Sequence, residues 1–398
     1  MQSYSGDFKS LARLLLSGFA RMANCTLSLL PVDEHLILME GSASYDDNAR
    51  PLFERMIEKG LNKTYRIVWF MDRPEKFGFL EDIPNVSVEK YWQRGLSPCG
   101  CMTFMKLNNV AKYCFYCNKR LGLRTEPGQK RFDLMHGVSF KNTSGVYGQE
   151  KCADAVFTPS TFWHPIISKC YANAEGHLVA TGYPRDDALV GERGEGLLSA
   201  FKSMTKIAWL PTFKRQMNNP KRNDFKVDLE TDVALLTDEA MMVINEQLVE
   251  SNAVLFVKFH PFQDLSFVNF TSLSNVVCLT QQDFENSNVF LYDFLNEFDA
   301  LITDFSSVAY DWLITDRPIA FDLTDYDNYR EGLGFSVDNV LDYMPGEKID
   351  SPSSFASFIR NVAAGVDLYS DERRLLSAQC QPFTDGGSSE RILDYVGL

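Results

Sequence analysis

Short apolar runs alternate with longer segments of helical length along most of the chain. Runs with the length and composition of strands occur at residues 64–70, 154–158 and 178–181. From residue 352 onward the pattern is mainly helical. Strands that alternate with helices usually pair in parallel, so the pattern predicts an α/β fold whose parallel sheets are covered by helices on both faces.

A charged stretch that contains glycines, Gly191 to Gly196, separates two series of this alternation. The 398 residues are enough for two or three domains of typical size, and 45% hydrophobic residues can build sizeable cores. We therefore predict two Rossmann-like domains, 1–190 and 191–398, with helices at the end of the second.

Two histidines end apolar runs of strand type. His136 is followed by Gly137 and, five residues on, by Lys141, whereas His260 comes two residues after Lys258. Ligands of open α/β sheets collect at the carboxyl ends of the strands. Either histidine alone is explained equally well as a structural residue. Two of them in matching contexts indicate a phosphate-transfer cleft.

A third apolar run, 300–304, ends at Asp304 and leads into a predicted helix start at Ser306 and Ser307. Serine hydroxyls and backbone N–H groups at such a position bind phosphate. The alternative is that these residues only cap the helix, which is compatible with anion binding at the same place. A fourth run, 207–210, precedes Thr212 and Lys214 and by itself indicates an ordinary basic loop.

In this order, the segments resemble the CDP-glycerol glycerophosphotransferase family, the bacterial enzymes that prime and polymerise teichoic acids and related cell-surface polymers. The resemblance covers most of the chain. It rests on six segments: Asp47-Asn48 after an early apolar run, His136-Gly137 with Lys141, Gly182 to Asp187, Pro211 to Lys214, Lys258 to Pro261, and Thr303 to Ser307.

The resemblance implies a transferase of glycosyltransferase-B architecture, with two Rossmann-like domains facing across a cleft. It also implies that the acceptor hydroxyl comes from the side of the first domain and that His136 takes its proton as general base. CDP-glycerol is expected to lie in the second domain and to release CMP. Its pyrophosphate is expected to contact His260, Ser306, Ser307, Lys214 and Lys258.

Further residues of the six segments are candidates for substrate binding. Asp47 and Asn48 either orient His136 or bind acceptor. Arg185 either binds substrate or, with Asp187, holds the turn between the domains. The complete set of predicted substrate-binding residues is Asp47, Asn48, Gly137, Lys141, Arg185, Thr212, Lys214, Lys258, Asp304, Ser306 and Ser307, beside the catalytic His136 and His260.

The sequence departs from the family pattern at three positions. Asp186 replaces an asparagine, Lys214 replaces an arginine, and an arginine-glycine pair expected beyond Tyr329 is Leu333-Gly334. Lysine keeps the charge but lacks the planar fork that grips phosphate. The last departure leaves a CDP-ribitol or nucleotide-sugar donor open. An inactive scaffold that binds a cell-surface polymer is the alternative from another class.

The formal net charge of -14, without a long basic run, argues against a nucleic-acid partner. The expected partners are the nucleotide-activated glycerol and a glycan or lipid-linked polymer acceptor. No metal motif demands a divalent ion. Asp325-Tyr326-Asp327 matches Asp-x-Asp by letter, but lies where the family has a donor-domain aspartate and tyrosine. We expect no metal and no cofactor beyond the donor substrate.

Nine cysteines form an odd set in a chain without a usual signal peptide, which favours a reducing compartment and no structural disulfides. Cys99 and Cys101, with Cys114 and Cys117, are four thiols that a zinc ion could use. Their spacing is unusual, and the apolar surroundings of the second pair favour buried free thiols.

No run approaches the ~20 apolar residues that a transmembrane helix needs, so we expect a cytoplasmic protein. An amino-terminal pattern is compatible with peripheral contact at the inner face of the membrane, as the family resemblance also implies. A helix packed on the first domain explains the pattern equally well. The apolar positions are Phe8, Leu11, Leu15, Phe19 and Met22, interspersed with Lys9, Arg13 and Arg21.

Overall fold

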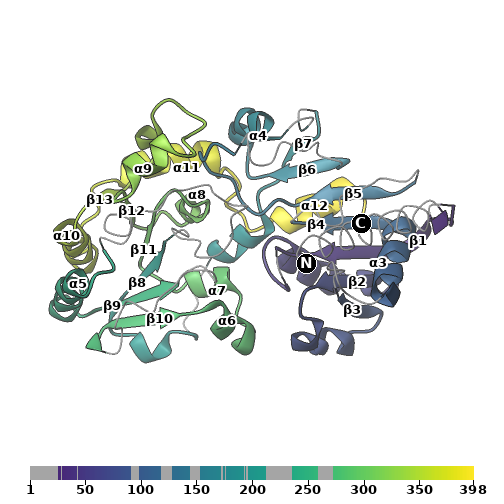
Figure 1. The fold of residues 1–398 in the computed structure, drawn as a ribbon, viewed down its shortest axis with the longest axis horizontal. Coiled ribbons are helices and arrows are strands. Elements are labelled where there is room, and N and C mark those ends of the chain that lie inside the picture. The colour runs from purple at the N-terminus through teal and green to yellow at the C-terminus, as the bar shows by residue number, and fades with distance from the viewer. Residues whose placement is uncertain are drawn as a thin grey trace, which may run out of the picture. The chain divides into compact units, whose positions relative to one another are not determined.

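The structure of the protein is a computed structural model. Its strands form two parallel sheets, each covered by helices (Figure 1). The described residues are 26–27, 29–42, 44–90, 98–117, 128–143, 153–171, 174, 176–191, 193, 196–211, 235–258 and 272–398. The amino-terminal pattern at residues 8–22 lies outside them. In the described part of the chain, no helix is long and apolar enough to cross a membrane.

The chain divides into two units. One comprises Met1–His136, Lys151–Phe157 and Gly397–Leu398, and the other comprises Gly137–Glu150 and Thr158–Val396. The boundary predicted at residue 191 falls inside the second unit. It lies between the last strand of the first sheet and the first strand of the second sheet. The division into an acceptor domain and a donor domain stays a prediction.

Within the described residues, the first sheet has seven strands in the order β3-β2-β1-β4-β5-β6-β7. All pairs from β3 to β6 are parallel. The runs predicted at 64–70, 154–158 and 178–181 are the strands β2, β6 and β7. The strands are β1 (Asp33–Glu40), β2 (Arg66–Met71), β3 (Val86–Lys90), β4 (Ala111–Tyr116), β5 (Lys130–Asp133), β6 (Ala155–Thr158) and β7 (Leu178–Ala180).

Two helices cover opposite faces of this sheet. Trp69 of β2 packs edge-on against Phe53 of α2 (Ala49–Glu58), with 5.6 Å between ring centroids. The next residue, Phe70, packs against Phe104 of α3 (Pro98–Val110) at 5.1 Å. Because successive residues of a strand point to opposite faces, α2 and α3 lie on opposite sides of the sheet.

In the part of the chain that the structure describes, the second sheet has six strands in the order β10-β9-β8-β11-β12-β13, and every pair is parallel. The runs predicted at 207–210 and 300–304 are the strands β8 and β11. The strands are β8 (Thr205–Leu210), β9 (Ala253–Lys258), β10 (Val276–Leu279), β11 (Ala300–Thr303), β12 (Ile319–Asp322) and β13 (Glu347–Ile349).

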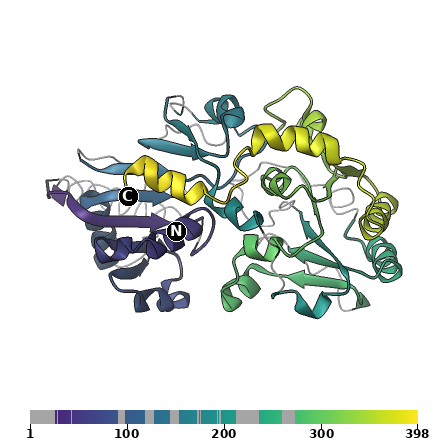
Figure 2. The same cartoon turned by 180° about the vertical axis from the view of Figure 1, so that it is seen from behind.

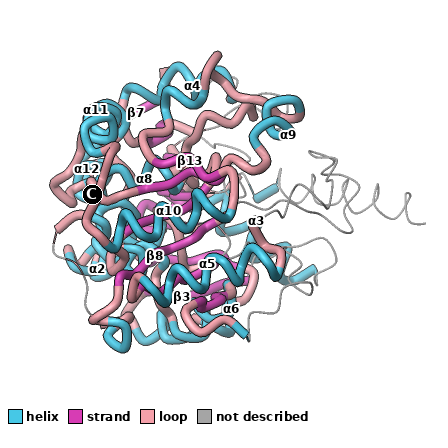
Figure 3. Tube along the Cα trace, turned by 90° about the vertical axis from the view of Figure 1, so that its left-hand side faces the viewer, coloured by secondary structure: helices cyan, strands magenta, loops and turns pink. Residues whose placement is uncertain are grey.

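Helices also lie on both faces of the second sheet. Trp209 of β8 contacts Phe355 of α10 (Pro352–Ala363), which runs beside α5 (Asp238–Glu250) over one face (Figure 3). On the other face, Phe256 of β9 contacts Phe294 of α7 (Leu291–Leu295). The predicted α/β fold with sheets covered on both faces is therefore confirmed.

The chain after β13 is mainly helical, as predicted, and its helices are yellow to yellow-green in Figure 2. The last helix packs against η5, a short 3-10 helix in the same unit. The remaining helices named below are α4 (His164–Cys170), η5 (Pro184–Leu189), α6 (Gln281–Ser287), α8 (Val308–Trp312), η8 (Leu313–Thr315), α9 (Tyr326–Glu331), α11 (Ser370–Cys380) and α12 (Ser388–Val396).

Candidate functional site

The strand order of the second sheet reverses between the neighbouring strands β8 and β11. From β8 the chain adds β9 and β10 on one side, and then β11, β12 and β13 on the other. Thr303, the last residue of β11, pairs with Leu210 of β8, and its hydroxyl donates to the Leu210 carbonyl at 2.6 Å. Open α/β sheets bind ligands where the strand order reverses in this way. Asp304 directly follows β11, and Pro211 directly follows β8.

The first sheet reverses its order between β1 and β4, and the predicted pair Asp47-Asn48 follows β1. Asn48 is completely buried. Its side-chain amide donates to the carbonyl oxygens of Leu134 at 2.9 Å and Met135 at 3.1 Å, all within the first unit. Asn48 thus fixes the two residues that precede His136.

The segment before His136 has an unusual backbone. β5 ends at Asp133, three residues earlier than the apolar pattern predicted, because the Asp133 carboxylate accepts the N–H of Met135 at 2.8 Å and turns the chain out of the sheet. Met135 has φ of 56°, in the left-handed region. Such strain persists in residues other than glycine where the surroundings impose it, which is common at functional sites. His136 itself is exposed.

Three segments of the family pattern meet at Gly137. A Cβ atom added to Gly137, whose φ is 108°, would lie 2.4 Å from Oγ of Ser307 and 2.5 Å from Nη2 of Arg185. All three residues belong to the second unit. Only a residue without a side chain fits this contact, so the glycine of the histidine-glycine pair brings Arg185 and Ser307 together.

Arg185 is 4% exposed and forms a buried ion pair. Its Nη2 lies 2.6 Å from Oδ2 of Asp311 in α8, and the hydroxyl of Tyr292 donates to the same oxygen at 2.6 Å. The guanidinium also lies over the Tyr292 ring, 5.0 Å from its centroid. The Arg185 charge is therefore matched inside the protein, while direct contact with substrate stays a prediction.

The two residues after Arg185 contact the carboxyl-terminal part of the chain. Oδ2 of Asp186 accepts from the side-chain amide of Gln381 at 3.1 Å. The Asp187 carboxylate accepts the N–H groups of Ser388 at 3.1 Å and Ser389 at 3.2 Å, the first two residues of α12. Burial raises the pKa of Asp187, and these hydrogen bonds oppose that shift. The segment thus joins α8, the end of α11 and α12.

Ser306 and Ser307 precede α8, which begins at Val308 as predicted. Ser307 occupies the N-cap position, but its side chain makes no capping hydrogen bond. The capping alternative therefore does not describe Ser307, whose hydroxyl instead points to Gly137. Both serines are half-buried.

Lys141 is held against the segment in which the sequence departs from the family pattern. It forms an antiparallel bridge with Phe335, and the N–H of Asn142 donates to the carbonyl of Gly334 at 3.0 Å. The Lys141 ammonium lies 5.7 Å from the centroid of the Tyr329 ring. Burial lowers the pKa of Lys141, whereas the Asp304 carboxylate opposes that shift. The Asp304 carboxylate is therefore close enough to act on the Lys141 charge.

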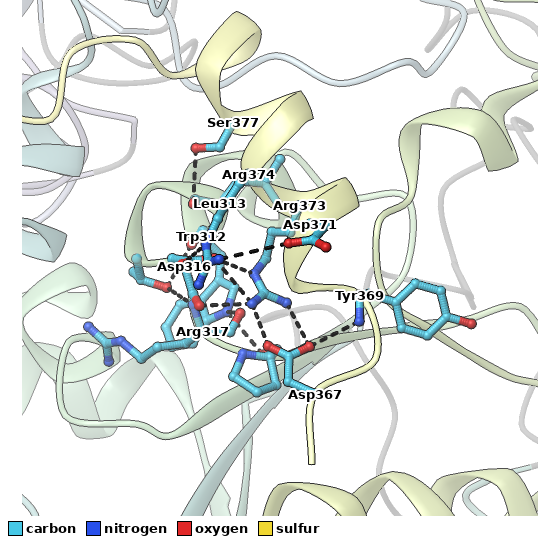
Figure 4. Close-up of polar contacts among 12 residues, drawn as sticks. Trp312, Leu313, Asp316, Arg317, Asp367, Tyr369, Asp371, Arg373, Arg374 and Ser377 are labelled. Atoms are coloured by element: carbon cyan, nitrogen blue, oxygen red, sulfur yellow. Dashed lines mark hydrogen bonds and ion pairs between the residues drawn. The ribbon is translucent and has the colours of Figure 1, made fainter. Parts of the chain in front are cut away.

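An arginine in α11 secures the far end of the α8–η8 run. Arg373 is 1% exposed and donates to the carboxylates of Asp316 at 3.2 Å and Asp367 at 2.5 Å, with a further bond to the Asp316 carbonyl at 2.9 Å (Figure 4). Ser377 donates to the carbonyl of Leu313 at 3.1 Å. The run that starts at Ser307 is thus fixed to α11 at its other end.

Other predicted site residues are only partly described. Lys258 ends β9, and its ammonium lies 5.5 Å from the centroid of the Phe284 ring of α6. His260, Thr212 and Lys214 lie outside the described residues, so their predicted roles stay predictions.

Cys114 and Cys117 are buried free thiols, as the preferred interpretation had it. Burial raises the pKa of both thiols, which disfavours the thiolate form that zinc binds. Cys99 and Cys101 lie in α3, but their side chains are not described. Within the described part of the chain, no three His, Cys, Asp or Glu side chains gather as metal ligands would.

Sequence reasoning missed Asp311 and Tyr292, which hold Arg185. A usable signal was present for Asp311. It stands alone among the apolar residues 308–312, and a charge in such a run must find a buried partner. Tyr292 and Gln381 carried no comparable signal.

Comparisons with known proteins agree with this picture. The chain is 20% identical over 388 residues to the teichoic acid poly(glycerol phosphate) polymerase of Staphylococcus epidermidis, covering 89% of this chain and 49% of that protein. It is 21% identical over 393 residues to the teichoic acid glycerol-phosphate transferase of Staphylococcus aureus, covering 93% and 94%. The chain thus spans about half of the first relative and most of the second.

A solved structure shares the fold. A variant of the wall teichoic acid polymerase TagF, soaked with CDPG, matches with a TM-score of 0.71 and 19% identity, over 99% of this chain and 97% of that chain. Residues 22–398 match the family described as CDP-Glycerol:Poly(glycerophosphate) glycerophosphotransferase. The chain belongs to the CDP-glycerol:poly(glycerophosphate) glycerophosphotransferase family.

Proposed function

We propose that the protein transfers glycerol phosphate from CDP-glycerol to a hydroxyl group of a cell-surface glycan, a teichoic acid or a lipid-linked acceptor, and releases CMP. The observation that carries this proposal is the meeting of Gly137, Arg185 and Ser307, which come from three distant segments of the family pattern. Family membership supports the choice of donor. The TagF variant soaked with CDPG has the same fold, which is compatible with this donor.

In the proposed reaction, His136 takes the proton of the acceptor hydroxyl as general base. The acceptor oxygen attacks the β-phosphorus of the donor, and the bond from that phosphorus to the CMP oxygen breaks. Phosphoryl-type transfer asks the protein mainly for alignment and for stabilisation of negative charge. Asn48 supports the role of His136 because it holds the backbone of the two preceding residues.

Donor binding is assigned to groups around the ends of β8, β9 and β11. Because the whole chain has a formal net charge of -14, a pyrophosphate requires locally concentrated cations. The proposed contacts are Lys141, Lys258, Ser306 and Ser307, together with Thr212, Lys214 and His260. Asp304, beside Lys141, is proposed to orient that cation. No metal is proposed, so turnover should persist in excess chelator.

A CDP-ribitol donor is the second candidate. The observation that favours it is the position of Leu333-Gly334, which departs from the family's arginine-glycine pair and lies against the Lys141 segment. A departure next to a proposed donor-binding lysine can change the donor. Competition between CDP-glycerol and CDP-ribitol, each measured by CMP release, separates the two.

A lipid-linked acceptor would bring the protein to the inner face of the membrane. We propose that the amino-terminal positions Phe8 to Met22 contribute to this contact. Sedimentation of the full chain with anionic and with neutral vesicles tests it. Binding only to anionic vesicles supports a peripheral contact, whereas no binding to either leaves these residues to pack on the protein.

The decisive experiment measures CMP release from CDP-glycerol by the purified chain, with and without a lipid-linked or glycan acceptor. We expect acceptor-dependent release that is lost in His136→Ala. Release without dependence on acceptor would indicate hydrolysis instead of transfer. No release from either CDP-polyol would favour a nucleotide-sugar donor or an inactive polymer-binding scaffold.

A further inference from the structure

Asp186 is a buried carboxyl group beside the site with too few partners for a charge. It is 1% exposed, and its flanking residue Arg185 is 4% exposed. Oδ2 accepts one hydrogen bond, from Gln381 at 3.1 Å, and Oδ1 accepts none. An isolated ionised carboxylate costs far more to bury than a neutral acid.

The nearby cation is already committed to another carboxylate. Nη2 of Arg185 lies 2.6 Å from Asp311, whereas Nε of Arg185 lies 3.8 Å from Oδ1 of Asp186, too far for a hydrogen bond. Asp311 also accepts from Tyr292 at 2.6 Å. One guanidinium and two buried carboxyl groups therefore share a small volume, and the geometry matches one ion pair and one neutral group.

The other charged neighbours do not supply a second cation. Asp187, next in the chain, is a further carboxyl group, and Arg391 of α12 pairs with Asp385 at 2.9 Å. Burial raises the pKa of Asp186 well above its usual range, and the Asp311 carboxylate adds to that shift, while Arg185 opposes it.

We propose that Asp186 is a positioning residue that carries a proton in the folded protein. As a neutral acid it leaves the Arg185 charge to Asp311, and Nη2 of Arg185 then stays in place beside Gly137. If Asp186 loses its proton to solvent, a second buried anion competes for the guanidinium and draws it away from Asp311. Arg185 would then shift relative to Gly137 and Ser307.

The sign of the pH dependence follows from the two states of the chain. In the unfolded chain Asp186 ionises near the ordinary aspartate pKa of about 3.9. In the folded protein it keeps its proton to a higher pH. Its contribution to stability is therefore fully present below the ordinary pKa and is lost as the pH rises through the folded pKa. An asparagine side chain is neutral at every pH, so the substitution Asp186→Asn removes this loss.

The test compares the melting temperature of the full chain and of Asp186→Asn between pH 5 and pH 8. We expect the melting temperature of Asp186→Asn to increase relative to that of the unmodified protein as the pH rises, by about 3 °C or more at pH 8. Asp322→Asn is the matched control. Asp322 is 2% exposed, but Thr324 donates to it twice, at 3.0 and 2.6 Å. This variant should show no such gain.

Infrared spectroscopy gives a second readout that does not depend on the stability of a variant. The unmodified protein at pH 7 should show the carbonyl band of a protonated carboxylic acid, and Asp322→Asn should retain it. Asp186→Asn, where it folds, should lose that band. Absence of the band from the unmodified protein, or a melting difference that stays constant with pH, would overturn the proposal.

The effect of Asp186 on donor binding rests on the proposed function, and it is measured separately. In Asp186→Asn the affinity for CDP-glycerol should be retained at alkaline pH, where that of the unmodified protein weakens. If the affinity for CDP-glycerol weakened equally in both proteins, Asp186 would not be a positioning residue. If neither protein released CMP, the transferase proposal would fail, whereas the melting and infrared measurements would still decide the protonation of Asp186.

Discussion

Asn48 donates from its side-chain amide to the main-chain carbonyl of Met135, 87 residues further along the chain, and Met135 directly precedes the proposed general base. A second bond from the same amide reaches the carbonyl of Leu134. A buried asparagine at the switch point of the first sheet thus holds the backbone that leads into His136.

Asn48→Ala should impair the enzyme beyond its cost in stability. The change leaves two buried carbonyls without their donor, at about 1 to 3 kcal/mol. Misplacement of His136 should lower turnover by about 10- to 100-fold. The control is Asn62→Ala, because the Asn62 amide also donates to a carbonyl, that of Pro84 at 3.0 Å, away from His136. Similar losses of turnover in both variants would contradict the prediction.

Gly137→Ala should weaken donor binding at least tenfold. The added methyl would collide with Ser307 and Arg185, so both must move. Gly191→Ala separates this effect from backbone strain, since Gly191 has φ of 96° and an added Cβ would meet no atom within 4 Å. Isothermal titration with CDP-glycerol measures the donor affinity of both variants. A loss in Gly191→Ala as large as that in Gly137→Ala would argue against the contact.

His136→Ala should separate chemistry from binding. General-base catalysis typically contributes about 10² to 10⁴-fold, so turnover should fall by that order. Affinity for CDP-glycerol should change little, because the base acts on the acceptor hydroxyl. Single-turnover kinetics and donor titration on the same preparation check the two quantities. A parallel loss of donor affinity would place His136 in the donor site instead.

Arg373→Met should destabilise the protein by about 1 to 3 kcal/mol, because it removes the buried donor of the hydrogen bonds to two partly buried carboxylates. Arg374→Met is the matched comparison. Arg374 also binds Asp316, at 2.6 Å, but its side chain is 63% exposed, and solvent screens that pair. The melting temperature of Arg374→Met should therefore stay close to that of the unmodified protein. Equal effects of the two changes would mean that Arg373 does not fix the end of the α8–η8 run.

The alternating pattern was sufficient to predict several strands, among them β2, β6 and β11, together with the parallel sheets and the helical carboxyl-terminal part. It failed at the end of β5, because Leu134 and Met135 are apolar and buried although they lie outside the strand. Residues buried in a loop and residues buried in a sheet are both apolar, so the sequence pattern does not distinguish them. The turn that separates them depends on the hydrogen bond from Met135 to Asp133.

The candidate site was predictable as a set of segments but not as a set of contacts. Strand ends marked Asp304, Ser306 and Ser307, while the pairing of Arg185 with Asp311 joins residues 126 positions apart. Periodicity holds no information on such distant pairs. The roles of His260, Thr212 and Lys214, which lie outside the described residues, stay predictions.

The bond between Asp187 and Ser388 spans 201 positions, and this has a consequence for how the protein is made. During synthesis, Asp187 leaves the ribosome long before the residues that it binds. The segment that carries Arg185 can therefore reach its final packing only after α12 has been translated. Contacts of such long range form slowly, because the intervening chain must first be ordered. Maturation of the site should be a late event in folding, detectable as delayed gain of donor binding after the sheets have formed.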